Sequence, residues 1–184
     1  MGKIYNFVAS RSKALSADTG SARAAKAKLR RAVGKLPQDC PEIWESVLFE
    51  LEDELARDEN ALKAIHLALT LFALHDSFFE GRGLGAAMNK LAPPGDDDKK
   101  SKKRRFDAAI TSNGYEELSN HLRGLVQLLK QEGIGLDCAK LAEDICWFLR
   151  GDEHKNRVTL QWGIDYYRTN NTENKSKEDS NNGD

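Results

Sequence analysis

The chain has 184 residues, of which 40% are apolar and 31% are charged, and its formal net charge is −1 at pH 7. This length suits one domain or two small subdomains with a buried core, and the composition points to a charge-rich helical protein. Three cysteines without a Cys-x-x-Cys pair argue against a disulfide framework or a zinc site and fit a reducing cytoplasm. No apolar run approaches the roughly 18 residues that a membrane span needs.

The near-zero total charge conceals blocks of opposite sign. Residues 1–35 hold nine bases and one acid, and residues 36–98 hold fourteen acids and four bases. Residues 99–168 are basic again, with thirteen bases and ten acids. Such asymmetry suggests a surface that faces a polyanion.

Strand-like alternation is almost absent, and turn residues divide the chain into helices. After an N-terminal segment (1–20), apolar spacing predicts an N-terminal helical subdomain (21–92) with helices over 21–34, 41–55 and 60–79. Gly34 can end the first helix, Pro41 can begin the second, and Asn60 can cap the third. The glycines of "GRGLGA" (81–86) indicate a turn, because a dinucleotide-binding loop needs a preceding strand and a helical pattern precedes this one.

A charged linker loop is expected at 93–103, "PPGDDDKKSKK", because Pro, Gly and runs of like charge cannot build a core. Its lysines are placed on this flexible loop: Lys99, Lys100, Lys102 and Lys103. The next stretch, "RRFDAAI", predicts a helix in which Phe106 and Ile110 face the core. At about 100° per residue, Arg104 then projects nearly opposite Phe106, and Arg105 projects from the flank.

A C-terminal helical subdomain (104–168) follows the linker. Gly133 can end its long central helix, and Asp137 can cap the helix after that. Val158, Trp162 and Tyr166 recur every four residues and predict a final helix. Residues 169–184 are polar and predict a disordered tail. The expected fold is therefore all-α, with two small helical subdomains joined by a charged loop.

No local pattern favours an enzyme. The acids between Glu50 and Glu59 are dense on a predicted amphipathic helix, which is typical of a solvated face or of a surface that meets a basic partner. Four histidines lack metal-ligand spacing, and no Ser/His/Asp or Cys/His signature is present: His66, His75, His121 and His154. We expect no catalysis, no cofactor, no metal and no small-molecule substrate.

Basic stripes are the strongest signal for function. On the helix predicted at 21–34, one stripe consists of Arg23, Lys26 and Arg30, and a second consists of Lys28, Arg31 and Lys35. Acids are missing from Thr19 to Gln38, whereas ordinary solvated faces mix both signs. Arginine suits bidentate contact with phosphate, and the scarcity of nearby aromatics favours contact with a nucleic-acid backbone over base stacking.

Several stretches, in this order, resemble the CasB family, the small subunit of the type I-E CRISPR Cascade complex. They are "AKLRRAVGKLP" (27–37), "FALHDSFFEGRGLGAAMNKLA" (72–92), "KKRRFDAAITSNGYEELSNHLRGLVQLLKQEGIGLDCAKLAEDI" (102–145) and "VTLQWGIDYY" (158–167). The resemblance implies a small helical protein without catalytic activity. It also implies assembly in more than one copy beside guide RNA and the other Cascade subunits.

The resemblance further implies that a basic surface holds displaced non-target DNA and steadies the R-loop. The contacts that it implies by motif position are Arg30, Arg31, Arg104, Arg105 and Arg123. Charge alone adds three more candidates: Lys26, Arg150 and Arg157. Whether DNA or RNA is preferred stays open at this point. The alternative is a helical protein–protein adaptor or regulator without nucleic-acid contact, with the acidic and basic helices as docking faces.

Overall fold

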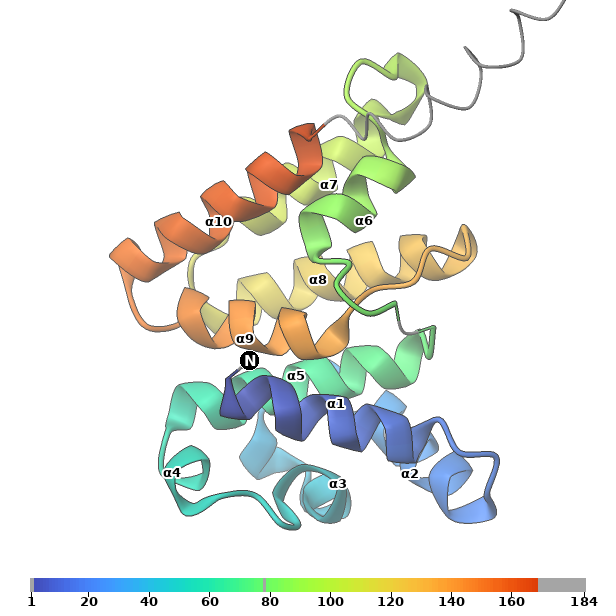
Figure 1. The fold of residues 1–184 in the computed structure, drawn as a ribbon, viewed down its shortest axis with the longest axis vertical. Coiled ribbons are helices and arrows are strands. Elements are labelled where there is room, and N and C mark those ends of the chain that lie inside the picture. Colours follow the sequence, from blue (N-terminus) through green and yellow to red (C-terminus); the bar gives the residue numbers. More distant parts are fainter. Residues whose placement is uncertain (1, 78, 169–184) are drawn as a thin grey trace, which may run out of the picture.

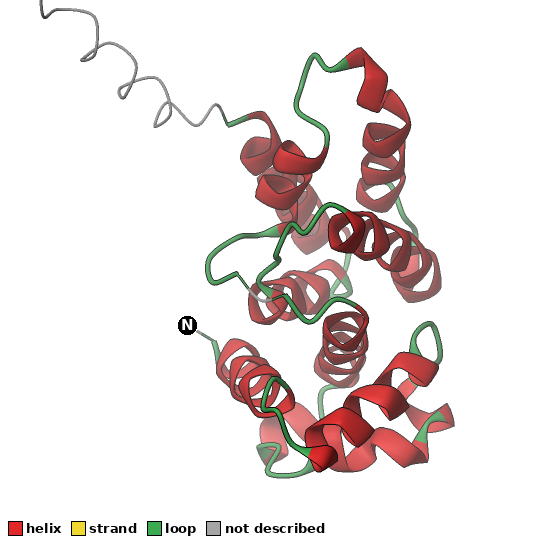
Figure 2. Ribbon diagram, turned by 90° about the vertical axis from the view of Figure 1, so that its right-hand side faces the viewer, coloured by secondary structure: helices red, strands yellow, loops and turns green. Residues whose placement is uncertain are grey.

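The structure, a computed structural model, describes residues 2–77 and 79–168 and is all-helical over them, which confirms the predicted fold class (Figures 1 and 2). The described residues contain no β-strand. The α-helices are α1 (Lys3–Leu15), α2 (Gly20–Ala32), α3 (Trp44–Leu48), α4 (Asp53–Ala56), α5 (Glu59–Leu74), α6 (Leu84–Leu91), α7 (Lys100–Ile110), α8 (Gly114–Gln131), α9 (Cys138–Phe148) and α10 (Asp152–Tyr167). Three short 3₁₀ helices add η1 (Pro37–Asp39), η2 (Pro41–Ile43) and η3 (Asp97–Lys99).

Helix α5 lies at the centre of the fold. Every residue from Ala64 to Ala73 is buried, as expected for a helix that is apolar on all sides. Helices α1, α2, α8 and α9 pack around it, and α3 and α4 cover its N-terminal part (Figure 1). Asp58 caps its first turn by accepting hydrogen bonds from the backbone N–H groups of Asn60 and Ala61. The cap is thus Asp58 and not the expected Asn60.

The N-terminal segment, for which the sequence predicted no element, forms helix α1. Ile4, Val8, Ser12 and Leu15 lie on one side of α1 and are buried against α9 and α5. Lysine, serine and alanine occupy many of the remaining positions, so this apolar stripe is narrow. The stripe nonetheless follows the helical period, which is the signal that could have revealed the helix.

Two predicted helices have different bounds in the structure. The helix expected over 41–55 is broken into η2, α3 and α4, and Glu50 between the last two has a φ of 55°. The helix expected to continue to about Phe79 ends at Leu74. For the first of these, one continuous helix was suggested by apolar residues on one face, but the chain turns between α3 and α4, which both pack on α5: Ile43, Val47, Leu48, Leu51 and Leu55.

In the second half of the chain, the helices of the structure agree better with those predicted from the sequence. Asp137 caps α9 by accepting from the N–H groups of Ala139 and Lys140, and Gly133 follows α8 with a φ of 66°. Val158, Trp162 and Tyr166 form the buried side of α10. The predicted tail, 169–184, lies outside the described residues.

Helix packing crosses the boundary that the sequence suggested at 93–103. Helix α6, from the N-terminal half, packs on α10, α7 and α8, whereas α9 packs on α1 and α5 (Figure 1). Asn89 of α6 donates to the carbonyl of Tyr166, and the Tyr166 hydroxyl donates to the carbonyl of Ala92. One continuous buried core therefore links the two halves.

A glycine permits the close crossing of α6 and α10. A Cβ atom added to Gly85 would lie 2.0 Å from the carbonyl oxygen of Trp162, which is far inside van der Waals contact. The glycine-rich stretch therefore serves helix packing, in agreement with the rejection of a nucleotide loop.

We predict that Gly85→Ala lowers the free energy of unfolding by about 1–3 kcal/mol, because the two helices must move apart. The matched control is Gly163→Ala on α10, where a Cβ atom would meet nothing within 4 Å. That change should stabilise the helix by about 0.5–1 kcal/mol. Urea unfolding measures both values, and equal effects of the two substitutions would contradict the crossing.

Candidate nucleic-acid interface

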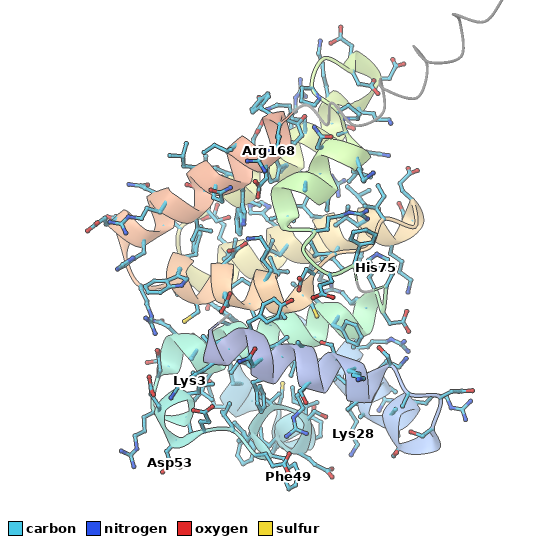
Figure 3. All side chains as sticks on the ribbon, viewed as in Figure 1. Lys3, Lys28, Phe49, Asp53, His75 and Arg168 are labelled. Atoms are coloured by element: carbon cyan, nitrogen blue, oxygen red, sulfur yellow. The ribbon has the colours of Figure 1, made fainter. Side chains whose placement is uncertain are left out.

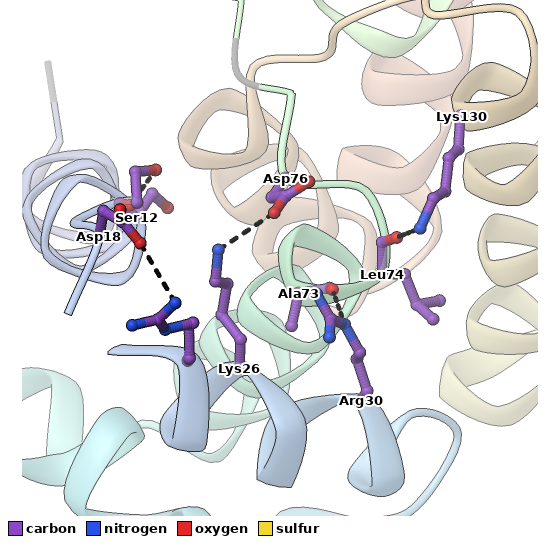
Figure 4. A network of polar contacts seen from close by, with 10 residues as sticks. Ser12, Asp18, Lys26, Arg30, Ala73, Leu74, Asp76 and Lys130 are labelled. Carbon is purple, nitrogen blue, oxygen red and sulfur yellow. Dashed lines mark hydrogen bonds and ion pairs between the residues drawn. The ribbon is translucent and has the colours of Figure 1, made fainter. Parts of the chain in front are cut away.

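Two of the three residues of the first basic stripe, Lys26 and Arg30, contact the C-terminal end of α5 and the residues after it, whereas Arg23 pairs with Asp18. Lys26 Nζ lies 3.0 Å from Oδ2 of Asp76, and Arg30 Nε donates to the carbonyl of Ala73 at 2.6 Å (Figure 4). Lys130 of α8 donates to the carbonyl of Leu74 at 2.8 Å. Cations stabilise a helix C-terminus because its last carbonyls are unpaired and carry partial negative charge. These side chains therefore hold α2 and α8 against α5.

The second stripe of α2 remains free of such contacts. Lys28, Arg31 and Lys35 are exposed and make no ion pair with the described residues. Lys28 is labelled in the lower part of Figure 3, far from Arg168 at the other end of the molecule. The apolar positions Ala22 and Leu29 are buried, as the amphipathic pattern predicted. The two stripes thus differ: one stabilises the fold, and the other faces solvent.

Arg123 of α8 lies between the basic residues of α2 and those of α7. A Cβ atom added to Gly34, just after α2, would lie 4.0 Å from Nη1 of Arg123. A Cβ atom added to Gly124, the next residue of α8, would lie 3.8 Å from Nη1 of Arg105 on α7. Arg123 of α8 therefore lies beside the turn that follows α2, and Arg105 of α7 lies beside α8.

The start of α7 holds its arginines outward. Phe106 is buried against Tyr166, with ring centroids 5.2 Å apart, while Arg104 and Arg105 are both exposed. Within the described part of the chain, neither guanidinium has an acidic partner. We call Arg31, Arg123, Arg105 and Arg104 the arginine row.

The lysines before this row were wrongly placed on a flexible loop. Helix α7 begins at Lys100, because the acids of "DDD" start a 3₁₀ turn and pair with the bases that follow. Each lysine has an acidic partner at 2.7–3.6 Å: Lys99 with Asp96, Lys100 with Asp97, Lys102 with Glu132, and Lys103 with Asp107. Oppositely charged side chains three and four residues apart on a helix attract each other, so this block neutralises itself.

The candidates chosen from charge alone also have partners in the fold. Arg150 pairs with Asp58, the cap of α5, and its guanidinium lies 4.7 Å from the centre of the Trp147 ring. Although burial opposes it, the Ala61 N–H and then the Arg150 guanidinium keep the pKa of Asp58 below its usual value. Arg157 pairs with Glu153 one turn away on α10. With Lys26 bound to Asp76, none of these three belongs to the row.

Arg30 has an intermediate position. Arg30 is exposed, but its Nε donates to a carbonyl at the end of α5. We therefore infer that Arg30 holds α2 in place and is not part of the arginine row. Lys130 has a similar role, and the motifs of the sequence did not reveal it, because it lies 56 residues from the carbonyl that it binds. No spacing rule along the chain predicts such a contact.

Metal-binding and cysteine chemistry have no support among the described residues. No group of His, Cys, Asp and Glu among them could hold a metal ion. The three cysteines are buried and unbonded, and burial raises the pKa of the Cys138 thiol to about 12, so it is not a reactive thiolate. In the part of the chain that the structure describes, no helix is both long and apolar enough to span a bilayer.

The fold and the site together define a helical protein whose arginine row, on α2, α7 and α8, has no acidic partner among the residues that the structure describes. The chain belongs to the Cse2 family of CRISPR-associated proteins, also named CasB: it matches the family described as CRISPR-associated protein Cse2 over residues 25–167. This match confirms the family resemblance seen in the sequence. Among curated protein sequences, none is significantly similar to the chain.

Solved structures agree with this assignment. CasB from Thermobifida fusca is 27% identical with a TM-score of 0.74, and CasB from Thermus thermophilus is 25% identical with a TM-score of 0.72. A second structure from Thermus thermophilus, described as a CRISPR-associated protein of the Cse2 family, shares the fold with 24% identity and a TM-score of 0.73. Each comparison covers 91% of this chain and 99% of the other.

We predict that two adjacent arginines of α2 differ in their effect on stability. Arg30→Gln should lower the free energy of unfolding by about 1–2 kcal/mol, because it removes a charged donor from the end of α5. Arg31→Gln, the matched control, should change it by less than about 0.5 kcal/mol. Chemical denaturation measures both, and an equal loss in the two variants would show that the stripes are not divided as described.

Proposed function

We propose that the chain is the non-catalytic small subunit of a type I-E CRISPR interference complex (Cascade) in the cytoplasm. In this complex it binds the backbone of displaced DNA along the arginine row and thereby stabilises the R-loop. Its partners are the other Cascade subunits, the guide RNA and a further copy of itself. The observation that carries the proposal is the arginine row, which has no acidic partner among the described residues of a Cse2-family protein.

Contact with the nucleic-acid backbone is what this chemistry supports best. A guanidinium presents several N–H donors in a fixed fork that matches a phosphate group. Most of the large exposed apolar side chains of the described residues lie on other helices and loops: Trp44, Leu48, Phe49, Phe79, Trp147, Leu160 and Ile164. The exception is Tyr167, which packs on Tyr166 beside Phe106 and Lys103 of α7, and stacking on a single tyrosine is tolerant of base identity. Binding is therefore expected to be independent of base sequence.

Modest binding energy is sufficient for such a role. Opening an R-loop exchanges a DNA duplex for an RNA–DNA duplex of about the same stability. A few phosphate contacts to the displaced strand shift this balance, because they exist only in the open state. Fixed arginines suit the task better than the neighbouring lysines, whose charges are already compensated by acids.

We predict that the double substitution Arg105→Glu and Arg123→Glu weakens binding of single-stranded DNA at least about tenfold, since each charge-assisted contact contributes about 1.5–3 kcal/mol. The matched control is Arg57→Glu with Arg157→Glu. Both arginines are exposed, and each pairs with the acid four residues before it in the chain, Arg57 with Asp53 and Arg157 with Glu153. Fluorescence anisotropy with labelled oligonucleotides measures the affinities.

The same two variants test the role in the complex. Assembled with the other subunits and guide RNA, the Arg105/Arg123 variant should form fewer R-loops, as detected by permanganate footprinting of the displaced strand, and the control should behave as wild type. If both variants lose binding equally, net charge and not the row is responsible. If neither does, the adaptor function without nucleic-acid contact is favoured.

A further inference from the structure

A cavity of about 220 Å³ lies between α5 and the segment that covers its N-terminal part. Ile43, Trp44, Val47 and Leu48 line it from η2 and α3, and Leu62 and His66 line it from α5. Most of the wall surface is apolar, and Gln38 and the paired Glu59 and Lys63 complete the lining beside the imidazole. This cavity is distinct from the arginine row, and nothing in the proposed function uses it.

His66 is the unusual member of the lining. Its side chain is 1% exposed, and neither Nδ1 nor Nε2 makes a hydrogen bond with the described residues. Burial lowers the pKa of His66 to about 4, so the ring is neutral at pH 7, with one nitrogen a donor and the other an acceptor. Buried polar groups without a partner are rare and costly, so an unpaired imidazole beside a cavity points to an absent binding partner.

The rim of the cavity is apolar. Trp44 and Leu48, which line it, are 45% and 40% exposed. The two charged residues of the lining, Glu59 and Lys63, pair with each other at 2.5 Å.

We propose that this cavity receives a tyrosine side chain from a partner protein. Its volume is sufficient for one aromatic ring, since an apolar cavity of about 150 Å³ already binds benzene. A phenol hydroxyl can pair with the His66 imidazole, whereas phenylalanine would leave that ring unpaired. Tyrosine is also a common anchor at protein interfaces, because it combines an apolar ring with a polar tip. The inference is independent of nucleic-acid binding.

Two small probes test the cavity directly. p-Cresol, the side-chain analogue of tyrosine, should bind about tenfold or more tightly than toluene, because only the phenol can pair with His66. The indole N–H of Trp44, which donates to the carbonyl of Pro37, provides a local NMR signal for titration. In His66→Phe the preference for p-cresol should disappear.

A substitution in the cavity wall distinguishes binding in the cavity from unspecific binding elsewhere on the protein. Leu62→Trp, at a half-buried position of the wall, should fill the cavity and abolish binding of both probes. Leu160→Trp is the matched control, because Leu160 is 65% exposed on α10, away from the cavity. Equal affinity for p-cresol and toluene, or an unchanged preference in His66→Phe, would overturn the proposal.

Capped peptides then test whether the occupant is a protein side chain. Gly-Ser-Tyr-Ser-Gly should displace p-cresol, whereas Gly-Ser-Ala-Ser-Gly should not. Displacement by the alanine peptide would show that the peptide backbone alone binds, and failure of the tyrosine peptide would exclude this anchor. A Trp44 signal that shifts with protein concentration without any probe would mean that a second copy of the chain occupies the site, which also overturns the proposal.

Discussion

The burial of helix α5 is the constraint on which the rest of the structure depends. A helix buried through its middle must have both ends satisfied within the fold, because water cannot pair with buried backbone groups. Asp58 satisfies the N-terminal end, and Arg30 and Lys130 donate to carbonyls at the C-terminal end. Lys26 adds an ion pair with Asp76 just beyond that end.

The outward arginines follow from these contacts. Once Lys26 and Arg30 hold α2 against the end of α5, the helical period directs Arg31 to the outer side. The same contacts fix α8 beside α2, so that Arg123 lies next to the turn after α2. Some of the basic residues of this region thus stabilise the fold, and this use determines where the others can face solvent.

A second junction connects the remaining segments. The buried carboxylate of Asp137 caps α9 with one oxygen, and with the other it accepts from the Tyr5 hydroxyl and the Gly81 N–H. Burial, with the nearby Asp137 charge, raises the pKa of Tyr5 to about 12, so the hydroxyl remains a donor. Helix α1, the glycine-rich turn and α9 therefore meet at one side chain. This junction orients the turn from which α6 crosses α10 at Gly85.

Local patterns predicted most of the helices, because α2, α8, α9 and α10 carry wide apolar stripes or clear caps. The break at Glu50 was not predictable, since it depends on covering α5 and not on any Gly or Pro in the chain. The row itself was only partly predictable. Helical spacing indicated that Arg31 and Arg104 face outward, but only the fold could show that Arg123 and Arg105 lie together and that Lys26, Arg150 and Arg157 are paired.

The salt dependence of single-stranded DNA binding tests the central claim most directly, because it counts the phosphates that the row neutralises. Four arginines predict that the logarithm of the binding constant falls with the logarithm of salt concentration at a slope of about −2.8. Replacing Arg105 and Arg123 by glutamine should reduce this slope to about −1.4. An unchanged slope in that variant would contradict the account, because the phosphates would then be bound elsewhere on the protein.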